Sequence, residues 1–163
     1  MNIYRQCFVQ VMSYFDNSVF ELLKVYMQDD YFYWLDKFKN TSIKTHDMAR
    51  FSSFEDFRDE HIDELLKSCY VKDLLSIVHG INSTVFEENG ADIFKEIQEA
   101  IGRRNVHIHN NGIADKAYID GFNIYGFQKG DFLTIDELVV RRIQALTRMI
   151  INNLSEGFTK KNP

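Results

Sequence analysis

Residues 3–28 read IYRQCFVQVMSYFDNSVFELLKVYMQ, and this stretch decides the fold. Its apolar side chains recur every three or four residues, which places them on one face of an amphipathic helix. The members of this stripe are Phe8, Met12, Phe15, Val19, Leu22, Leu23 and Tyr26. The spacing predicts a helix from about Ile3 to Gln28.

The same period continues after a polar connection over residues 39–48. Ser52 followed three residues later by Glu55 has the form of a capping box, so a second helix is predicted to begin there. Its apolar positions run on to Val78, either as one long helix or as two helices broken near Ser68. Gly80 is the predicted stop.

Two further helices are predicted downstream. The first has its apolar positions at Ile93, Phe94, Ile97, Ala100 and Ile101. It should end at Gly112, because glycine adopts the left-handed conformation that terminates a helix without a side-chain clash. Thr134 and Glu137 form a second capping-box pattern, which predicts a last amphipathic helix reaching about Ser155.

Two segments are less regular. An aromatic cluster over residues 31–38 can either close the core or stack nucleobases, and the core interpretation is favoured. Residues 121–133 are compatible with a small hairpin, in which Ile124, Tyr125 and Phe127 face Phe132 and Leu133, or with an ordered loop. Because strands and helices do not alternate and no repeat is present, the sequence predicts an all-α bundle of four to five helices.

Length and composition are those of one globular domain. The chain has 163 residues, of which 45% are hydrophobic, so we expect residues 1–163 to form a single domain around one core. Cys7 and Cys69 are the only cysteines and form no CxxC pattern, which favours a reducing, cytoplasmic setting. No apolar run approaches the length of a membrane span, and we expect no signal peptide, anchor or membrane partner.

Charge is distributed unevenly along the chain. The net charge is −5, yet residues 1–100 carry 10 Lys/Arg and 18 Asp/Glu, whereas residues 101–163 carry 9 and 6. Arg103, Arg104, Arg141, Arg142 and Arg148 all lie in this basic part and could converge on a polyanion such as RNA. The alternative for the last three is a solvated helix face.

The richest chemistry lies in residues 103–112, which read RRNVHIHNNG. Arginine offers a charged, forked donor suited to phosphate, and histidine can exchange a proton near neutral pH. The alternative is structural, because Arg and His near a helix end can simply satisfy terminal carbonyls and complement the helix dipole. In an ideal helix His109 lies roughly 140° around from Arg104, so the two can address one phosphate only if the arginine extends or the helix loosens.

Arg104-Asn105, three further residues and His109-Asn110 resemble the RNxxxHN form of the HEPN motif. The resemblance rests on about ten residues and on the helix that leads into them. It implies a helical, usually homodimeric domain whose paired motifs form a metal-independent endoribonuclease cleft. Arg104 and His109 match the catalytic positions, and Asn105 and Asn110 are expected to orient them. His107 has no fixed counterpart and is either a neighbour or a participant.

The chemistry that the resemblance implies is cleavage of RNA by its own 2′-hydroxyl, with His109 as general acid or base and Arg104 as the electrostatic stabiliser. Arg103, Arg141 and Arg142 are candidate RNA contacts. Family association further implies a toxin–antitoxin or anti-phage role, with an antitoxin or regulatory protein as partner. The alternative is a non-catalytic HEPN-like module that binds nucleotide or RNA, or that only dimerises.

No cofactor or metal is expected. The sequence contains no HExxH, EF-hand loop or Cys/His array, and His107 and His109 are only two residues apart, so a metal enzyme is the weaker option. Neither a P-loop nor a dinucleotide-binding glycine motif is present. His46, His61 and His79 lack the motif context and are expected to be structural or solvated.

Overall fold

The computed structural model describes residues 3–38, 43, 45–122 and 126–159. Its helices are α1 (Ile3–Asp29), α2 (Tyr31–Lys37), α3 (Thr45–Met48), α4 (Phe54–Lys67), α5 (Val71–Ile81), α6 (Phe94–His109), α7 (Lys116–Phe122) and α8 (Glu137–Thr159). A 3-10 turn, η1 (Ser83–Phe86), and a hairpin of two short strands, β1 (Glu87–Glu88) and β2 (Ala91–Asp92), connect α5 to α6. The predicted all-α class is confirmed.

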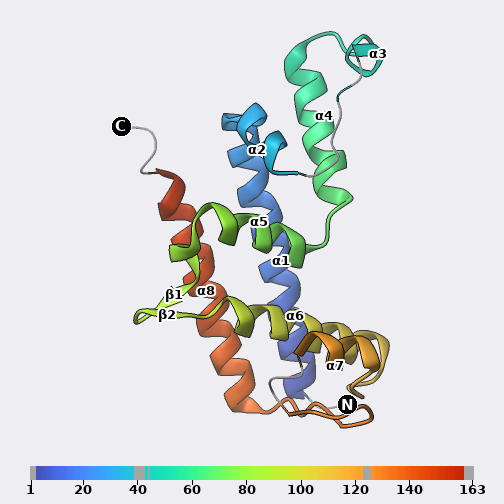
Figure 1. Ribbon diagram of the computed structural model, residues 1–163, viewed down its shortest axis with the longest axis vertical. Helices are drawn as coiled ribbons and strands as arrows, with labels where there is room; N and C mark the ends of the chain where they lie inside the picture. The colour runs from blue at the N-terminus through green and yellow to red at the C-terminus, as the bar shows by residue number, and fades with distance from the viewer. Residues whose placement is uncertain (1–2, 39–42, 44, 123–125, 160–163) are drawn as a thin grey trace.

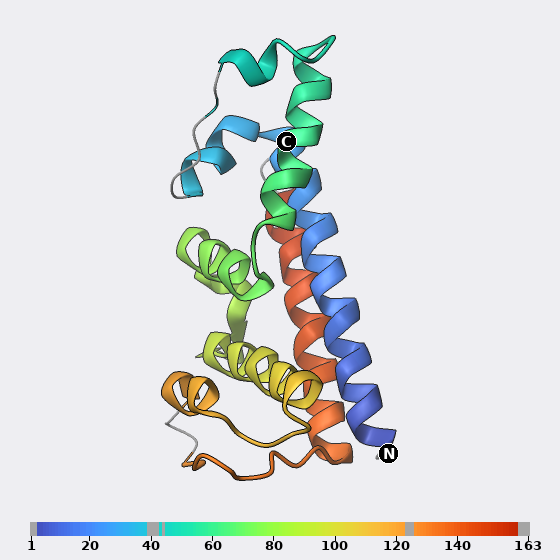
Figure 2. The ribbon, with the colours of Figure 1, turned by 90° about the vertical axis from the view of Figure 1, so that its right-hand side faces the viewer.

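The two long helices, α1 and α8, lie side by side and run in the same direction (Figures 1 and 2). Near their C-terminal ends, the Tyr26 hydroxyl of α1 donates to the Leu154 carbonyl of α8 at 3.0 Å. Because the pair is parallel, the chain between them must return to the starting end. It does so through α4, α5 and α6.

The shorter helices α5 and α6 cross one face of the α1–α8 pair, and α7 lies outside α6 (Figure 2). The contacting faces bury the apolar stripes that the sequence analysis identified. The largest side chains with almost no exposed surface include Phe8, Met12, Leu23, Leu74, Leu75, Ile97, Leu146 and Ile150. The core therefore draws on both long helices and on both crossing helices, and it places α6 directly against α1.

The predicted starts of α4 and α8 are displaced slightly from the observed ones. The N-cap of α4 is Ser53, not Ser52, and its hydroxyl accepts from the Asp56 amide at 3.0 Å. Before α8, the carboxylate that accepts from the Val139 amide belongs to Asp136, at 2.9 Å, rather than to Thr134. Both capping-box predictions therefore name the wrong capping residue. Several adjacent polar side chains could cap each helix, and only the backbone geometry selects one of them.

Other boundaries follow the predictions closely. α1 matches its predicted range to within one residue, and the chain between residues 54 and 81 forms two helices, with Ser68 as the C-cap of the first. α5 continues one residue past Gly80, and α8 continues to Thr159 rather than ending near Ser155. Within the described residues, α2, α3, α7, the turn η1 and the β1–β2 hairpin were not predicted as such, because each is too short to show a clear period.

The segment before α8 takes the second of its two predicted forms, an ordered loop, and not the hairpin. α7 ends at Phe122 and residues 126–136 form an ordered loop, in which Phe132 makes an isolated bridge with Ile113. Ile124 and Tyr125, which were predicted to face this segment, lie outside the described residues. The loop closes a second small core around the end of α6, made of Val106, Ala114, Tyr118 and Leu133.

The aromatic cluster over residues 31–38 belongs mainly to the core. Tyr31, Trp34 and Phe38 are buried, whereas Phe32 is 65% exposed. The core interpretation of this cluster is therefore confirmed for three of its rings. Among the described helices, none is long and apolar enough to cross a membrane.

Candidate functional site

The Arg/His segment occupies the last two turns of α6 and the loop that follows. The Asn110 amide donates to the Val106 carbonyl at 2.9 Å, and the Gly112 amide donates to the same carbonyl at 3.1 Å. Asn111 and Gly112 both have positive φ, 51° and 85°. The predicted glycine exit is confirmed, and the two residues together turn the chain sharply away from α6.

Gly112 is also required by packing. A Cβ at this position would lie 2.7 Å from Cε1 of His107 and 2.8 Å from the ring of Phe132. The Leu133 amide donates to the Gly112 carbonyl at 2.8 Å, and the Ala114 amide donates to the Asp131 carbonyl at 2.8 Å. The exit loop is thus clamped against residues 131–133, which fixes where the segment ends.

Arg104 points toward α1 and pairs with Asp16. Its Nη2 lies 2.6 Å from Oδ2 of Asp16, and only 17% and 15% of the two side chains are exposed. The Nε of Arg104 and the Oδ1 of Asp16 are buried without a hydrogen-bond partner among the described residues. Burial raises the pKa of the Asp16 carboxyl, and the nearby Arg104 guanidinium opposes that rise. The predicted catalytic arginine is therefore held within the chain by one contact.

His109 is the last residue of α6 and is exposed. Among the described residues, none forms a hydrogen bond or ion pair with its ring. Asn105, one turn earlier, is also exposed, and the Asn110 side-chain amide donates to the Ile113 carbonyl. No described contact joins Arg104 to His109, as expected from their 140° separation around the helix. The chain presents the imidazole to solvent and the guanidinium to α1.

His107 is a core residue. Its ring is 1% exposed, and Nε2 lies 2.7 Å from the Leu133 carbonyl, so Nε2 carries the proton and donates. Nδ1 is buried without a partner in the described part of the chain. Burial lowers the pKa of this imidazole, the positive charges of Arg5 and Arg103 lower it further, and the bond to Leu133 opposes them. This neutral, buried ring therefore ties α6 to the loop before α8.

Arg103 is committed to a buried polar cluster. Its Nε donates to Oε1 of Glu99 at 2.8 Å, and Nη1 donates to the Thr134 carbonyl at 3.2 Å. The Tyr118 hydroxyl donates to the same Glu99 oxygen. Burial is the main cause that raises the pKa of the Tyr118 phenol, and the contact with Glu99 raises it further. Glu99 is only 7% exposed. Arg103, predicted as an RNA contact, links α6, α7 and the loop instead.

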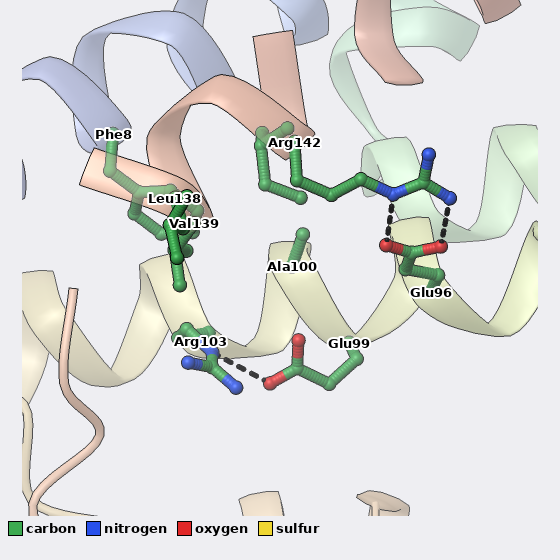
Figure 3. Close-up of a pocket in the computed structure, with 9 residues that line it drawn as sticks. Phe8, Glu96, Glu99, Ala100, Arg103, Leu138, Val139 and Arg142 are labelled. Carbon is green, nitrogen blue, oxygen red and sulfur yellow. Dashed lines mark hydrogen bonds and ion pairs between the residues drawn. The ribbon is translucent and has the colours of Figure 1, made fainter. Parts of the chain in front are cut away.

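The other predicted RNA contacts are also paired with carboxylates. Arg142 binds both oxygens of Glu96 at 2.7 and 2.8 Å and also contacts Glu88, and these hydrogen bonds raise the pKa of its guanidinium. Arg141 pairs with Glu137 at 2.7 Å on the exposed face of α8. The Arg142–Glu96 and Arg103–Glu99 pairs line one pocket of about 500 Å³. Figure 3 shows these two pairs together with the apolar side chains of Phe8 and Leu138, which line the same pocket. The structure thus brings Arg103 and Arg142 to one pocket, whereas Arg104 pairs with Asp16 of α1 and Arg141 lies on the exposed face of α8.

Sequence reasoning did not identify Asp16, Glu99 or Tyr118. A signal for Asp16 was available, because it follows Met12 by four residues and so places a carboxylate beside the apolar stripe of α1. A charge at such a position needs a partner, although the sequence does not say which. No group of three or more His, Cys, Asp or Glu residues that could hold a metal ion occurs in the described part of the chain.

The comparisons with known proteins leave the residues and geometry as the only evidence about function. No family model, curated protein or solved structure matches this chain.

Proposed function

We propose that this protein is a cytoplasmic, metal-independent endoribonuclease of the HEPN type, acting as a homodimer. The observation that carries the proposal is the RNxxxHN segment at the end of α6, which offers an exposed imidazole at His109 and a guanidinium at Arg104 one to two turns earlier. Asn105 and Asn110 flank these two groups in the proposed site.

The proposed chemistry uses the ribose 2′-hydroxyl as the nucleophile. His109 removes its proton as the 2′-oxygen bonds to phosphorus, and the bond from phosphorus to the 5′-oxygen breaks. A proton delivered to that 5′-oxygen completes the reaction and leaves a 2′,3′-cyclic phosphate. Arg104 stabilises the negative charge on the phosphorane oxygens. If two chains share one cleft, the two copies of His109 divide the roles of base and acid.

The test is cleavage of single-stranded RNA by the purified full chain. We expect His109→Ala and Arg104→Ala each to reduce kcat by about 10² to 10⁴-fold, because each removes a group that acts in the transition state. Arg148→Ala, an exposed arginine on α8, serves as the control and should retain activity. Cleavage should persist in a strong chelator and stop on an all-2′-deoxy substrate.

The proposal fails if folded wild-type dimer leaves RNA intact, or if His109→Ala cuts at the wild-type rate. The proposed biological setting is a toxin–antitoxin or anti-phage system with an antitoxin or regulatory partner, which rests on family association alone. Expression of the wild type in a bacterium should then arrest growth, and His109→Ala should not.

A second candidate is a non-catalytic HEPN-like module that dimerises or binds nucleotide or RNA. The observation that favours it is the pairing of the motif-side arginines, since Arg103, Arg104 and Arg142 each contact a carboxylate within the chain. Absence of cutting together with retained dimerisation would support this candidate over the enzyme.

A further inference from the structure

A groove of about 650 Å³ lies between the start of α1 and the end of α6. α1 contributes Arg5, Gln6, Val9 and Gln10 to its wall, and the α6 end contributes His107, Ile108 and Asn111. The Arg5 guanidinium also donates to the His107 carbonyl, which holds it at the groove. Among the described residues that line it, none is acidic, in contrast to the pocket of Figure 3, which contains Glu96 and Glu99. A guanidinium and three carboxamides with no carboxylate suit a ligand that is negatively charged and also carries hydrogen-bonding edges.

The groove and the Arg104–Asp16 pair both lie along the line of contact between α1 and α6, here called the seam. Asp16 follows the groove residue Val9 by seven positions, which is almost two full turns and therefore the same face of α1. Arg104 precedes the groove residue Ile108 by one turn of α6. A chain molecule lying in the groove and extending along the seam would thus reach the motif arginine.

Asp16 competes with any anion for Arg104. The single 2.6 Å contact neutralises the guanidinium, and the second carboxylate oxygen and the arginine Nε have no partner in the described residues. This ion pair is mostly buried and only partly hydrogen-bonded. It therefore contributes little net stability, because each unpartnered atom carries a desolvation cost. A phosphate can replace the carboxylate as the acceptor for the same donors.

We propose that this groove is the binding site for single-stranded RNA, in which Gln6 and Gln10 contact the nucleotide and a backbone phosphate displaces Asp16 from Arg104. The inference rests on the proposed function and supplies the path of its substrate. Amide side chains both donate and accept, as base edges require, and the splayed bases of a single strand leave those edges free. Asp16 then restrains binding, whereas the two glutamines promote it.

The experiment measures binding of a short, fluorescently labelled single-stranded RNA to the full-length His109→Ala protein, so that the probe is not cut. In this background the double change Gln6→Ala and Gln10→Ala should raise the Kd by about ten-fold or more, because two hydrogen bonds to the RNA are lost. Asp16→Asn, which keeps the shape and removes the charge, should tighten the Kd by about three- to ten-fold. The tightening should shrink at high salt.

Matched controls are available on the same protein. A second groove between α1 and α8 also has amides and an arginine, Gln144, Asn152 and Arg148, but contains no motif residue. Gln144→Ala with Asn152→Ala should leave the Kd unchanged. Asp63 pairs with Lys24 at the same 2.6 Å distance between α4 and α1, so Asp63→Asn controls for loss of an ion pair. Thermal unfolding of every variant verifies the fold.

Two results would overturn the inference: RNA binding that is insensitive to the glutamine changes, or Asp16→Asn binding that is weaker or equal. Loss of dimer on changing the glutamines would assign the groove to a second copy of the chain and would also overturn it. Tight, groove-dependent binding without cleavage by the wild type would retain this inference and reject the enzyme. If the groove variants cleave RNA at the wild-type rate, the proposed enzyme is retained and this inference is rejected.

Discussion

At the scale of single residues, neighbouring positions of the motif have opposite roles. His107 is buried, neutral and bonded to the Leu133 carbonyl, whereas His109, two residues later, is exposed at the helix end. The same residue type therefore serves packing in one case and is free for chemistry in the other. The difference comes from the 100° advance per residue, which carries position 107 into the second core and position 109 out of it.

The buried His107 imidazole predicts a loss of stability in mild acid. Its pKa is lowered in the folded chain, chiefly by burial, so below the ordinary value of 6.5 the unfolded state binds the proton more readily than the folded state. The free energy of unfolding should therefore fall as the pH drops from about 7 to 5, by up to about 1.4 kcal/mol per pH unit from this group. Urea unfolding across that range measures the slope.

His107→Gln can still donate to Leu133 but does not titrate, so this variant should lose that part of the slope. His109→Gln, on the same helix, controls for removal of a histidine at an exposed position. An acid-induced fall that is equally steep in wild type and His107→Gln would contradict the assignment of His107 as the sensitive group.

At the scale of elements, hydrogen bonds among Glu99, Arg103 and Tyr118, here called the clasp, fix the end of α6 together with apolar contacts. Glu99 accepts from both Tyr118 of α7 and Arg103 of α6, and Arg103 also reaches the loop before α8. Glu99 is buried and paired, and such a carboxylate is costly to leave with fewer donors. The clasp holds three segments in register around the candidate site.

Removing one donor from this clasp should destabilise the fold measurably. Tyr118→Phe preserves the ring but deletes the hydroxyl that donates to Glu99, and we expect the free energy of unfolding to fall by about 1–3 kcal/mol. Chemical denaturation gives the value. Tyr14→Phe, at a tyrosine of α1 that is 64% exposed, should change it by less than about 0.5 kcal/mol. Equal effects of the two changes would show that the clasp contributes nothing.

At the scale of the whole molecule, one chain does not bring the two proposed catalytic groups together. Arg104 lies in the α1–α6 seam and His109 faces solvent, so a working cleft requires a second copy, a shift of the arginine, or both. Of the two long parallel helices, α1 contributes the acceptor that pairs with Arg104. The acid-rich first hundred residues supply Asp16, the partner of the motif arginine.

A shared cleft predicts that activity depends on assembly. The RNA cleavage rate per chain should be constant at high protein concentration and fall on dilution below the dimer dissociation constant, because the active species is then second order in chain. Analytical ultracentrifugation over the same concentrations locates the dissociation. A rate per chain that is unchanged across dissociation would show that one chain is sufficient and would reject the shared site.

Most helices were predictable because the 3.6-residue period is a local property of the sequence. α1 and α6, the break at Ser68 and the exit at Gly112 follow from apolar spacing and from glycine's access to positive φ. The short elements were not predictable, since a four-residue helix or a two-residue strand has no period. Caps were misplaced by one or two residues, because Ser52 and Ser53, or Thr134 and Asp136, are equally able to cap until the backbone path is known.

The sequence by itself determined the helical class, the apolar faces and the position of the Arg/His segment at a helix end, because each depends on residues close together in the chain. Only the tertiary structure decided that Arg104 pairs with Asp16, that Arg103 joins Glu99 and Tyr118, and that His107 is buried. These outcomes depend on which helices cross and at which turn. A charge 88 positions away can reach Arg104 only once α6 has packed across α1.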